Sequence, residues 1–146
     1  MKFVPKITRI QLKTIPAEEV SLIGIVSSEP DYKLSLVLNK KLKISLKNIT
    51  PVTITGSNGN QLSFSRFSWL NSSTDESFNL VSNRNGSNFL LKNLRNVDYI
   101  LQIREPGQNN NIEHLTTTLK TIESITALFI IDSKSIKDKY LQYLIH

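Results

Sequence analysis

The chain has 146 residues, a size that suits one α+β domain over residues 1–146, and its formal net charge is +6 at pH 7. It contains no cysteine, which excludes disulfides, thiolate metal sites and cysteine nucleophiles. No apolar run approaches the roughly 20 residues of a membrane span, so we expect a cytoplasmic protein with no membrane partner.

The first strand candidates lie near the amino terminus. Residues 7–12 show a loose alternation around Ile7 and Ile10, and residues 20–26 form a nearly continuous apolar run broken by Gly24. A run without a polar face is typical of a strand buried on both faces. Gly24 would admit a bulge or the close approach of a neighbour.

The next segment fits two structures. Ser28-Glu29-Pro30-Asp31 resembles a helix start, with proline in the first turn and acids at the positive end of the helix dipole. The apolar residues that follow lie on one helical face, but they also alternate with period two, as in a hairpin that turns at Asn39-Lys40-Lys41. The start pattern favours a helix over residues 31–42.

A run of strands is expected in the middle of the chain. Residues 62–70 carry Phe64, Phe67 and Trp69, and the apolar phase changes between the two phenylalanines, which predicts a bulge near Ser65-Arg66. The hairpin turn sequence Asn85-Gly86 separates two of the later strands. The later strands are expected at residues 77–82, 89–91 and 99–103.

The last third begins with the clearest helix, over residues 111–123, where four apolar residues lie on one face. Residues 124–131 have no polar face toward their end, which predicts a central strand. From Ser135 a capping pattern, Ser135-x-x-Asp138, indicates a further helix. The expected fold is therefore α+β: a single antiparallel or mixed sheet of about six strands with two or three helices packed on one face.

Several short motifs occur in an order that resembles one protein family. They are Leu22-Ile23-Gly24-Ile25-Val26-Ser27-Ser28, Asp31-Tyr32-Lys33-Leu34, Leu38-Asn39-Lys40, Phe64-Ser65-Arg66-Phe67-Ser68-Trp69, Leu80-Val81-Ser82-Asn83, Asp98-Tyr99-Ile100-Leu101 and Ile130-Ile131-Asp132 with Ser135-Ile136-Lys137. Together they cover the chain from about residue 7 onward. They resemble the IPExxxDY family, a group of small bacterial proteins of the Bacteroidetes lineage. The resemblance implies a fold and brings no established activity.

The naming motif of that family is only partly present. Asp98-Tyr99 is retained, but neither Lys92-Asn93-Leu94 nor Leu91-Lys92-Asn93 matches its Ile-Pro-Glu. We expect a structural role for the motif residues Asp31, Tyr32, Asp98 and Tyr99. The ring of Tyr99 is expected in the core, and Asp98 is expected to accept hydrogen bonds from local backbone amides of the preceding turn.

No catalytic or metal-binding arrangement can be named. His146 is the last residue of the sequence, and His114 lies on a predicted helix with no acid three or four positions away. No nucleophile pattern and no glycine-rich phosphate loop occurs. We therefore expect no catalytic residue, no metal and no cofactor, and a protein that is not an enzyme.

Two groups of residues are candidates for binding. Residues 1–50 hold nine cations and four acids, a net +5 of the total +6, and Lys33, Lys40, Lys41, Lys43 and Lys47 could form a surface for phosphate or nucleic acid. Arg66, Phe67 and Trp69 could stack on a base or a ligand ring. The alternatives are a solvated lysine-rich surface and a core strand with one outward arginine.

The sequence thus favours a non-enzymatic binding or accessory protein that acts through another protein. The alternative is an RNA-associated protein that uses the basic amino-terminal third, from Lys33 to Lys47. The oligomeric state is left open.

Overall fold

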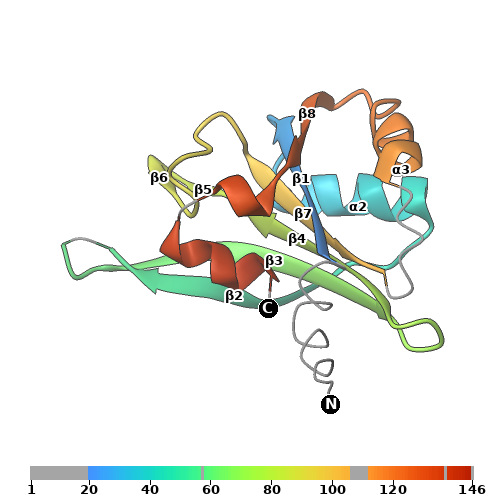
Figure 1. Ribbon diagram of the computed structural model, residues 1–146. Helices are drawn as coiled ribbons and strands as arrows, with labels where there is room; N and C mark the ends of the chain where they lie inside the picture. The colour runs from blue at the N-terminus through green and yellow to red at the C-terminus, as the bar shows by residue number, and fades with distance from the viewer. Residues whose placement is uncertain (1–19, 57, 106–111, 137, 146) are drawn as a thin grey trace, which may run out of the picture.

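One antiparallel sheet of six strands, in the order β2-β3-β4-β7-β1-β8, organises the chain (Figure 1). The computed structural model describes residues 20–56, 58–105, 112–136 and 138–145, so the strand candidate at residues 7–12 lies outside the described residues. The predicted α+β class and the six-stranded sheet are confirmed. The strands are β1 (Val20–Ser27), β2 (Lys47–Thr55), β3 (Gln61–Asn71), β4 (Glu76–Ser82), β7 (Tyr99–Arg104) and β8 (Ile125–Ile131).

Shorter elements complete the fold. The helices are α2 (Asp31–Leu42), α3 (Ile112–Leu119) and α4 (Gln142–Ile145), the 3-10 turns are η3 (Ser133–Ser135) and η4 (Lys139–Leu141), and a two-stranded ribbon pairs β5 (Arg84–Asn85) with β6 (Asn88–Phe89). Among the helices of the described residues, none has the length and apolar character that crossing a bilayer would require.

The helix predicted over residues 31–42 is present as α2, and the hairpin alternative is excluded. Asp31 lies in its first turn, and its last turn holds two lysines, as the helix dipole favours. Lys43 ends the helix in the left-handed conformation, with φ 58°. The side chain of Asn39 then exchanges two hydrogen bonds with the backbone of Leu46, which turns the chain into β2.

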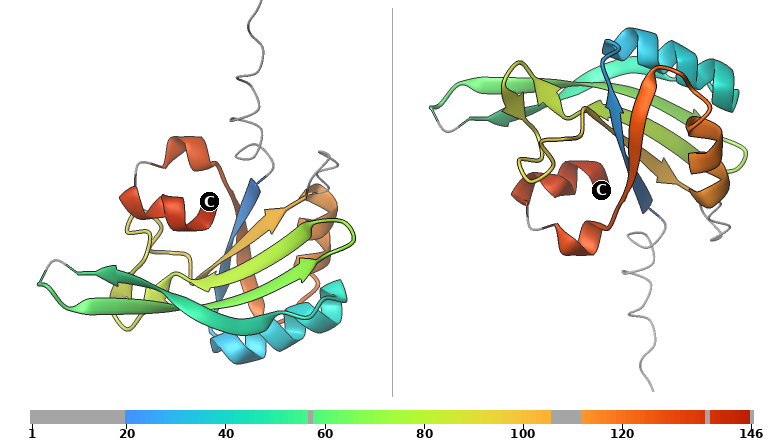
Figure 2. Two further views of the ribbon diagram at one scale, coloured as in Figure 1. Left: turned by 90° about the horizontal axis from the view of Figure 1, so that it is seen from below. Right: turned by 90° about the horizontal axis from the view of Figure 1, so that it is seen from above.

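Apolar side chains cover both faces of the sheet. Ile23 of β1 belongs to the core beneath α2 and α3, whereas its neighbour Leu22 belongs to a second core on the opposite face. Leu141 and Leu144, from η4 and α4, pack into that second core, so the helical segments lie on both sides of the sheet (Figure 2). This corrects the expectation that all helices pack on one face. The physical reason is that the central strands are apolar on both faces and need cover on each.

The bulge expected in β3 lies in the neighbouring strand instead. Phe64 and Phe67 of β3 point to opposite faces and fill different cores, as an odd spacing requires in a regular strand. The irregularity falls in β2 between Ile49 and Val52, across from Ser65. The change of apolar phase therefore records a strand buried on both faces rather than a bulge.

Two strands differ from the prediction in other ways. β2 was not predicted, because it contains a proline and few apolar residues, and it forms one edge of the sheet. β8 was predicted to be central but forms the opposite edge: among the described strands it pairs only with β1. Its sequence, ITALFII, looks central because apolar residues occupy both faces, yet two of them, Phe129 and Ile130, are exposed.

Candidate functional site

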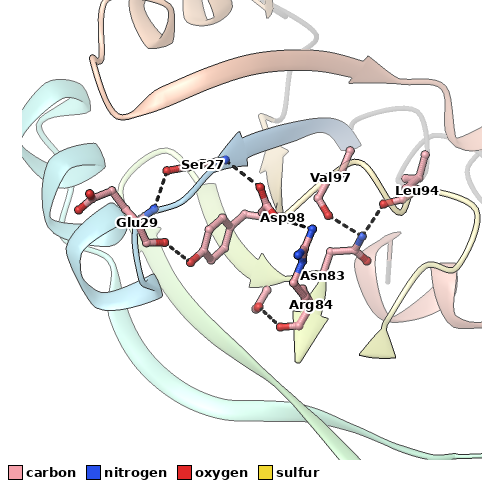
Figure 3. A network of polar contacts seen from close by, with 9 residues as sticks. Ser27, Glu29, Asn83, Arg84, Leu94, Val97 and Asp98 are labelled. Carbon is pink, nitrogen blue, oxygen red and sulfur yellow. Dashed lines mark hydrogen bonds and ion pairs between the residues drawn. The ribbon is translucent and has the colours of Figure 1, made fainter. Parts of the chain in front are cut away.

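A network of polar contacts joins the motif residues Asp98 and Tyr99 to the residues just before α2 (Figure 3). One carboxylate oxygen of Asp98 accepts a hydrogen bond from the Ser27 amide at 2.9 Å, and the other pairs with the Arg84 guanidinium at 3.0 Å. The Tyr99 hydroxyl donates to the Glu29 carbonyl oxygen at 2.5 Å. These contacts fix the end of β1 and the first turn of α2 against β7.

The partner of Asp98 differs from the expected one. We expected local backbone amides, but the Ser27 amide is 71 residues away in sequence. Antiparallel pairing of β1 with β7 brings the two strand ends together, and this pairing cannot be read from the neighbouring residues. Burial, with the negative charges of Asp31, Asp98 and Glu29 nearby, raises the pKa of Tyr99 to about 12.

Asn83 fixes the long loop that follows the β5–β6 ribbon. Its side-chain amide donates to the carbonyl oxygens of Leu94 and Val97 at 2.8 and 2.9 Å, and its side-chain oxygen accepts from the Leu91 amide at 2.8 Å. The residue is fully buried. All three of these hydrogen bonds join the Asn83 side chain to backbone groups. The arrangement therefore stabilises the loop and leaves no side-chain group of Asn83 free for chemistry.

The other two motif residues lie at the surface. The Asp31 carboxylate accepts a hydrogen bond from the Tyr32 amide at 2.7 Å at the start of α2. The ring of Tyr32 is exposed and belongs to neither core.

The lysines proposed for phosphate binding are all exposed, on α2, at its end and at the start of β2. Lys33, Lys40 and Lys41 project from α2, whereas Lys47 begins β2 at the edge of the sheet. Lys40 and Lys41 also line a groove that contains the carboxylates of Glu29 and Glu123. Lys43 is exposed at the end of α2. Alternating charges weaken the attraction that an anionic strand would feel there.

The pleat of β3 places Arg66 on one face of the sheet and both Phe67 and Trp69 on the other. Phe67 is buried in the core beneath α2, and Trp69 packs against the same core at 5.8 Å from the ring of Phe78. Arg66 points to the opposite face, where its side chain donates to the Thr50 carbonyl oxygen. The three side chains therefore do not form a common stacking surface.

The described residues hold no cluster of three or more histidine, aspartate or glutamate side chains arranged to bind a metal ion. His114 is exposed on α3. No nucleophile and base can be named together from the contacts of the described residues.

The outer edge of β8 is the feature that the sequence reasoning missed. Ile130 is 63% exposed on one face of this strand, and Phe129 is 42% exposed on the other. An irregularity at the start of β8 sets Thr126 apart, and Ala127 to Ile131 then pair regularly with β1. In the described part of the chain no strand pairs with the other side of β8. One signal in the sequence could have indicated this edge: β8 contains no charged residue.

The two edges of the sheet differ in the features that normally prevent pairing. β2 begins with Lys47, contains Pro51 and is interrupted between Ile49 and Val52. Charges, prolines and bulges on an edge strand all hinder the addition of another strand. β8 has neither a charge nor a proline. Within the part of the chain that the structure describes, Ala127 to Ile131 of β8 therefore form an apolar, regularly paired edge, and β2 does not.

Comparisons with known proteins add no family or relative. No family model matches the chain. No curated protein matches it either. Membership of the IPExxxDY family therefore stays a prediction that rests on the motifs.

Proposed function

We propose that this protein is a non-enzymatic binding protein that accepts an extended segment of another protein along the outer edge of β8. The observation that carries the proposal is the exposure of Phe129 and Ile130 on an edge strand with no charge and no proline. Addition of a strand would satisfy the outward backbone groups of β8 and cover these side chains.

The chemistry of the partner segment follows from the two faces of β8. Ile130 is exposed on the face that carries α2, and Phe129 on the opposite face. A partner strand that covers both must offer apolar side chains at successive positions rather than at alternate ones. The net charge of +6 favours a partner that is neutral or acidic around this segment over a second, equally charged copy.

Affinity capture with matched variants tests the proposal. The full-length chain, its Ile130→Lys variant and its Leu36→Lys variant are immobilised, and the proteins captured from a lysate of the source cells are quantified by mass spectrometry. Leu36 lies on α2 and is 62% exposed, so this control introduces the same charge at an equally exposed apolar position. We expect one or more proteins to be captured by the wild type and the Leu36 variant and lost at least tenfold with Ile130→Lys.

Two results would contradict the proposal. Equal loss with both variants would show that exposed apolar surface in general, and not the β8 edge, retains the captured proteins. A concentration-dependent dimer in gel filtration with light scattering, abolished by Ile130→Lys, would assign the edge to a second copy of this chain. Melting temperatures of both variants control for folding.

A further inference from the structure

A second surface, independent of β8, gathers positive charge around an open groove. The groove has a volume of about 540 Å³ and lies between the tip of the β2–β3 hairpin, the β5–β6 ribbon, the loop that follows it and η4. A volume of this size suits a small ligand or one unit of a polymer. The loop that follows the ribbon lies beside the carboxyl-terminal helical segment (Figure 2), where the Lys92 amide donates to the Asp138 carboxylate.

Three cations line this groove: Lys92, Arg95 and Lys139. Among the described residues no carboxylate lines it, and none forms an ion pair with these three cations. The carboxylate of Asp138, next to Lys139, is occupied with the backbone amides of Lys92 and Tyr140 at 3.2 and 2.9 Å. Three unpaired cations around one concave surface attract a ligand that carries phosphate.

Aromatic rings beside the groove position two of these cations. The guanidinium of Arg95 lies 5.9 Å from the ring centre of Phe89, and the ammonium of Lys139 lies 5.0 Å from that of Tyr140. Contacts of this kind hold a cation in place without neutralising its charge. Arg84 also lies on Phe89, at 5.2 Å, but its charge is paired with Asp98.

The remaining wall of the groove is rich in amides. Asn58, Asn60 and Asn88 line it, and an asparagine side chain offers both a donor and an acceptor. Such groups can bind the edge of a nucleobase, while a guanidinium plane can stack on its face.

We propose that this groove binds a nucleotide, with Lys92, Arg95 and Lys139 at the phosphate and the asparagine amides at the base. The nucleotide can be free or part of single-stranded RNA, since both present the same phosphate and base. Neither the residues of β8 nor the lysines of α2 take part.

Fluorescence anisotropy on the full-length chain tests the assignment. The probe is a labelled single-stranded RNA of ten nucleotides in low salt, with unlabelled adenosine monophosphate, uridine monophosphate and inorganic phosphate as competitors. The groove variant Lys92→Gln/Arg95→Gln/Lys139→Gln is compared with Lys33→Gln/Lys40→Gln/Lys41→Gln, which removes the same charge from α2. Thermal melting of both triple variants controls for folding.

We expect the groove variant to lose at least tenfold in affinity and the α2 variant less than twofold. The slope of log K against log salt should lie near −2, since three cations each contribute about −0.7 on a single strand. If a mononucleotide displaces the labelled RNA, a free nucleotide is sufficient for binding to the groove. If no mononucleotide displaces it, the ligand of the groove is single-stranded RNA.

Three results would overturn the proposal. They are no binding of RNA or mononucleotide in low salt, equal losses in the two triple variants, and competition by inorganic phosphate as strong as that by the nucleotides. The last result would show an anion site without a place for the base.

Discussion

Tyr99 illustrates how one side chain can tie a strand to a helix. Its ring is buried in the core, and its hydroxyl donates to the Glu29 carbonyl oxygen just before α2. The raised pKa, about 12 against an ordinary 10, means that the folded protein holds this proton more tightly than the unfolded chain does. The corresponding stability is complete below pH 10 and is lost as the pH rises from 10 through 12.

This linkage predicts the alkaline behaviour of Tyr99→Phe. The wild type should lose up to about 2 to 3 kcal/mol of unfolding free energy between pH 10 and 12 through this group, and the variant should lack that part of the slope. Below pH 9 the variant should be less stable by about 1 kcal/mol, because its hydrogen bond is gone. Urea unfolding over this pH range measures both effects, with Tyr32→Phe as the control for an exposed ring. Identical slopes for the wild type and Tyr99→Phe would show that the tyrosine ionises as easily in the folded protein as in the unfolded chain.

Substitution of Asn83 should lower the unfolding free energy by more than Tyr99→Phe does at neutral pH. In Asn83→Ala, the Leu91 amide and the carbonyl oxygens of Leu94 and Val97 lose their partners inside the protein. We expect the unfolding free energy to fall by about 3 to 5 kcal/mol, since each buried group left unpaired costs about 1 to 3 kcal/mol. Asn85→Ala is the control: it removes one exposed hydrogen bond, to Ser63, and should cost less than about 1 kcal/mol. Equal losses in the two variants would mean that the loop is held by other contacts.

At the scale of elements, β1 depends on a close approach at Gly24. A Cβ atom at this position would lie 2.9 Å from a methyl group of Val97, with Ile131 on β8 at 3.3 Å. Gly24 therefore lets the loop before β7 pack directly on β1. The sequence predicted a bulge or a close neighbour at this glycine, and the neighbour is Val97.

The contact between Gly24 and Val97 predicts that substitutions at these two positions have non-additive effects on stability. Gly24→Ala should destabilise the protein by about 1 to 3 kcal/mol through overpacking against Val97. In the double variant Gly24→Ala/Val97→Ala the space vacated by the valine receives the new methyl group, so the combined loss should be smaller than the sum of the single losses by about 1 kcal/mol. Chemical denaturation of the four proteins measures this cycle, and strict additivity would contradict the contact.

The elements that could be predicted are those with local signals. α2 begins and ends where the proline, the acids and the leucine spacing indicate. β2 was missed because Pro51 and its polar neighbours lack a strand pattern, and only pairing with β3 makes this segment a strand. β8 was placed at the centre because apolar residues on both faces are typical of central strands, and strand order depends on contacts that are distant in sequence.

The candidate sites were less predictable than the fold. The sequence led to Lys33 and its neighbouring lysines, which are exposed, and to Arg66, whose side chain donates to the Thr50 carbonyl oxygen of the neighbouring strand. Lys92 and Lys139 both line the cationic groove, and they lie close together only because η4 packs beside the loop after β6. Residues that lie 47 positions apart in the sequence leave no local pattern from which their meeting could be predicted.

At the scale of the whole molecule, one sheet with two covered faces leaves two edges, and within the described residues β8 is the edge that carries no charge and no proline (Figure 1). The cationic groove lies elsewhere, at the ends of β2 and β3. Binding of a protein segment and binding of a nucleotide would thus use separate surfaces, and variants in one should leave the other unchanged. This independence distinguishes failure of either proposal from failure of the fold.

The most direct measurement of the central claim is photo-crosslinking from the β8 edge. Benzoylphenylalanine replaces Ile130 in the full-length chain, and in a second sample it replaces Leu36, which is equally exposed on α2. After irradiation in a lysate of the source cells, mass spectrometry identifies the linked peptide. The account predicts that position 130, and not position 36, links to an apolar segment of another protein. Links from position 130 only to a second copy of this chain, or the same products from both positions, would contradict it.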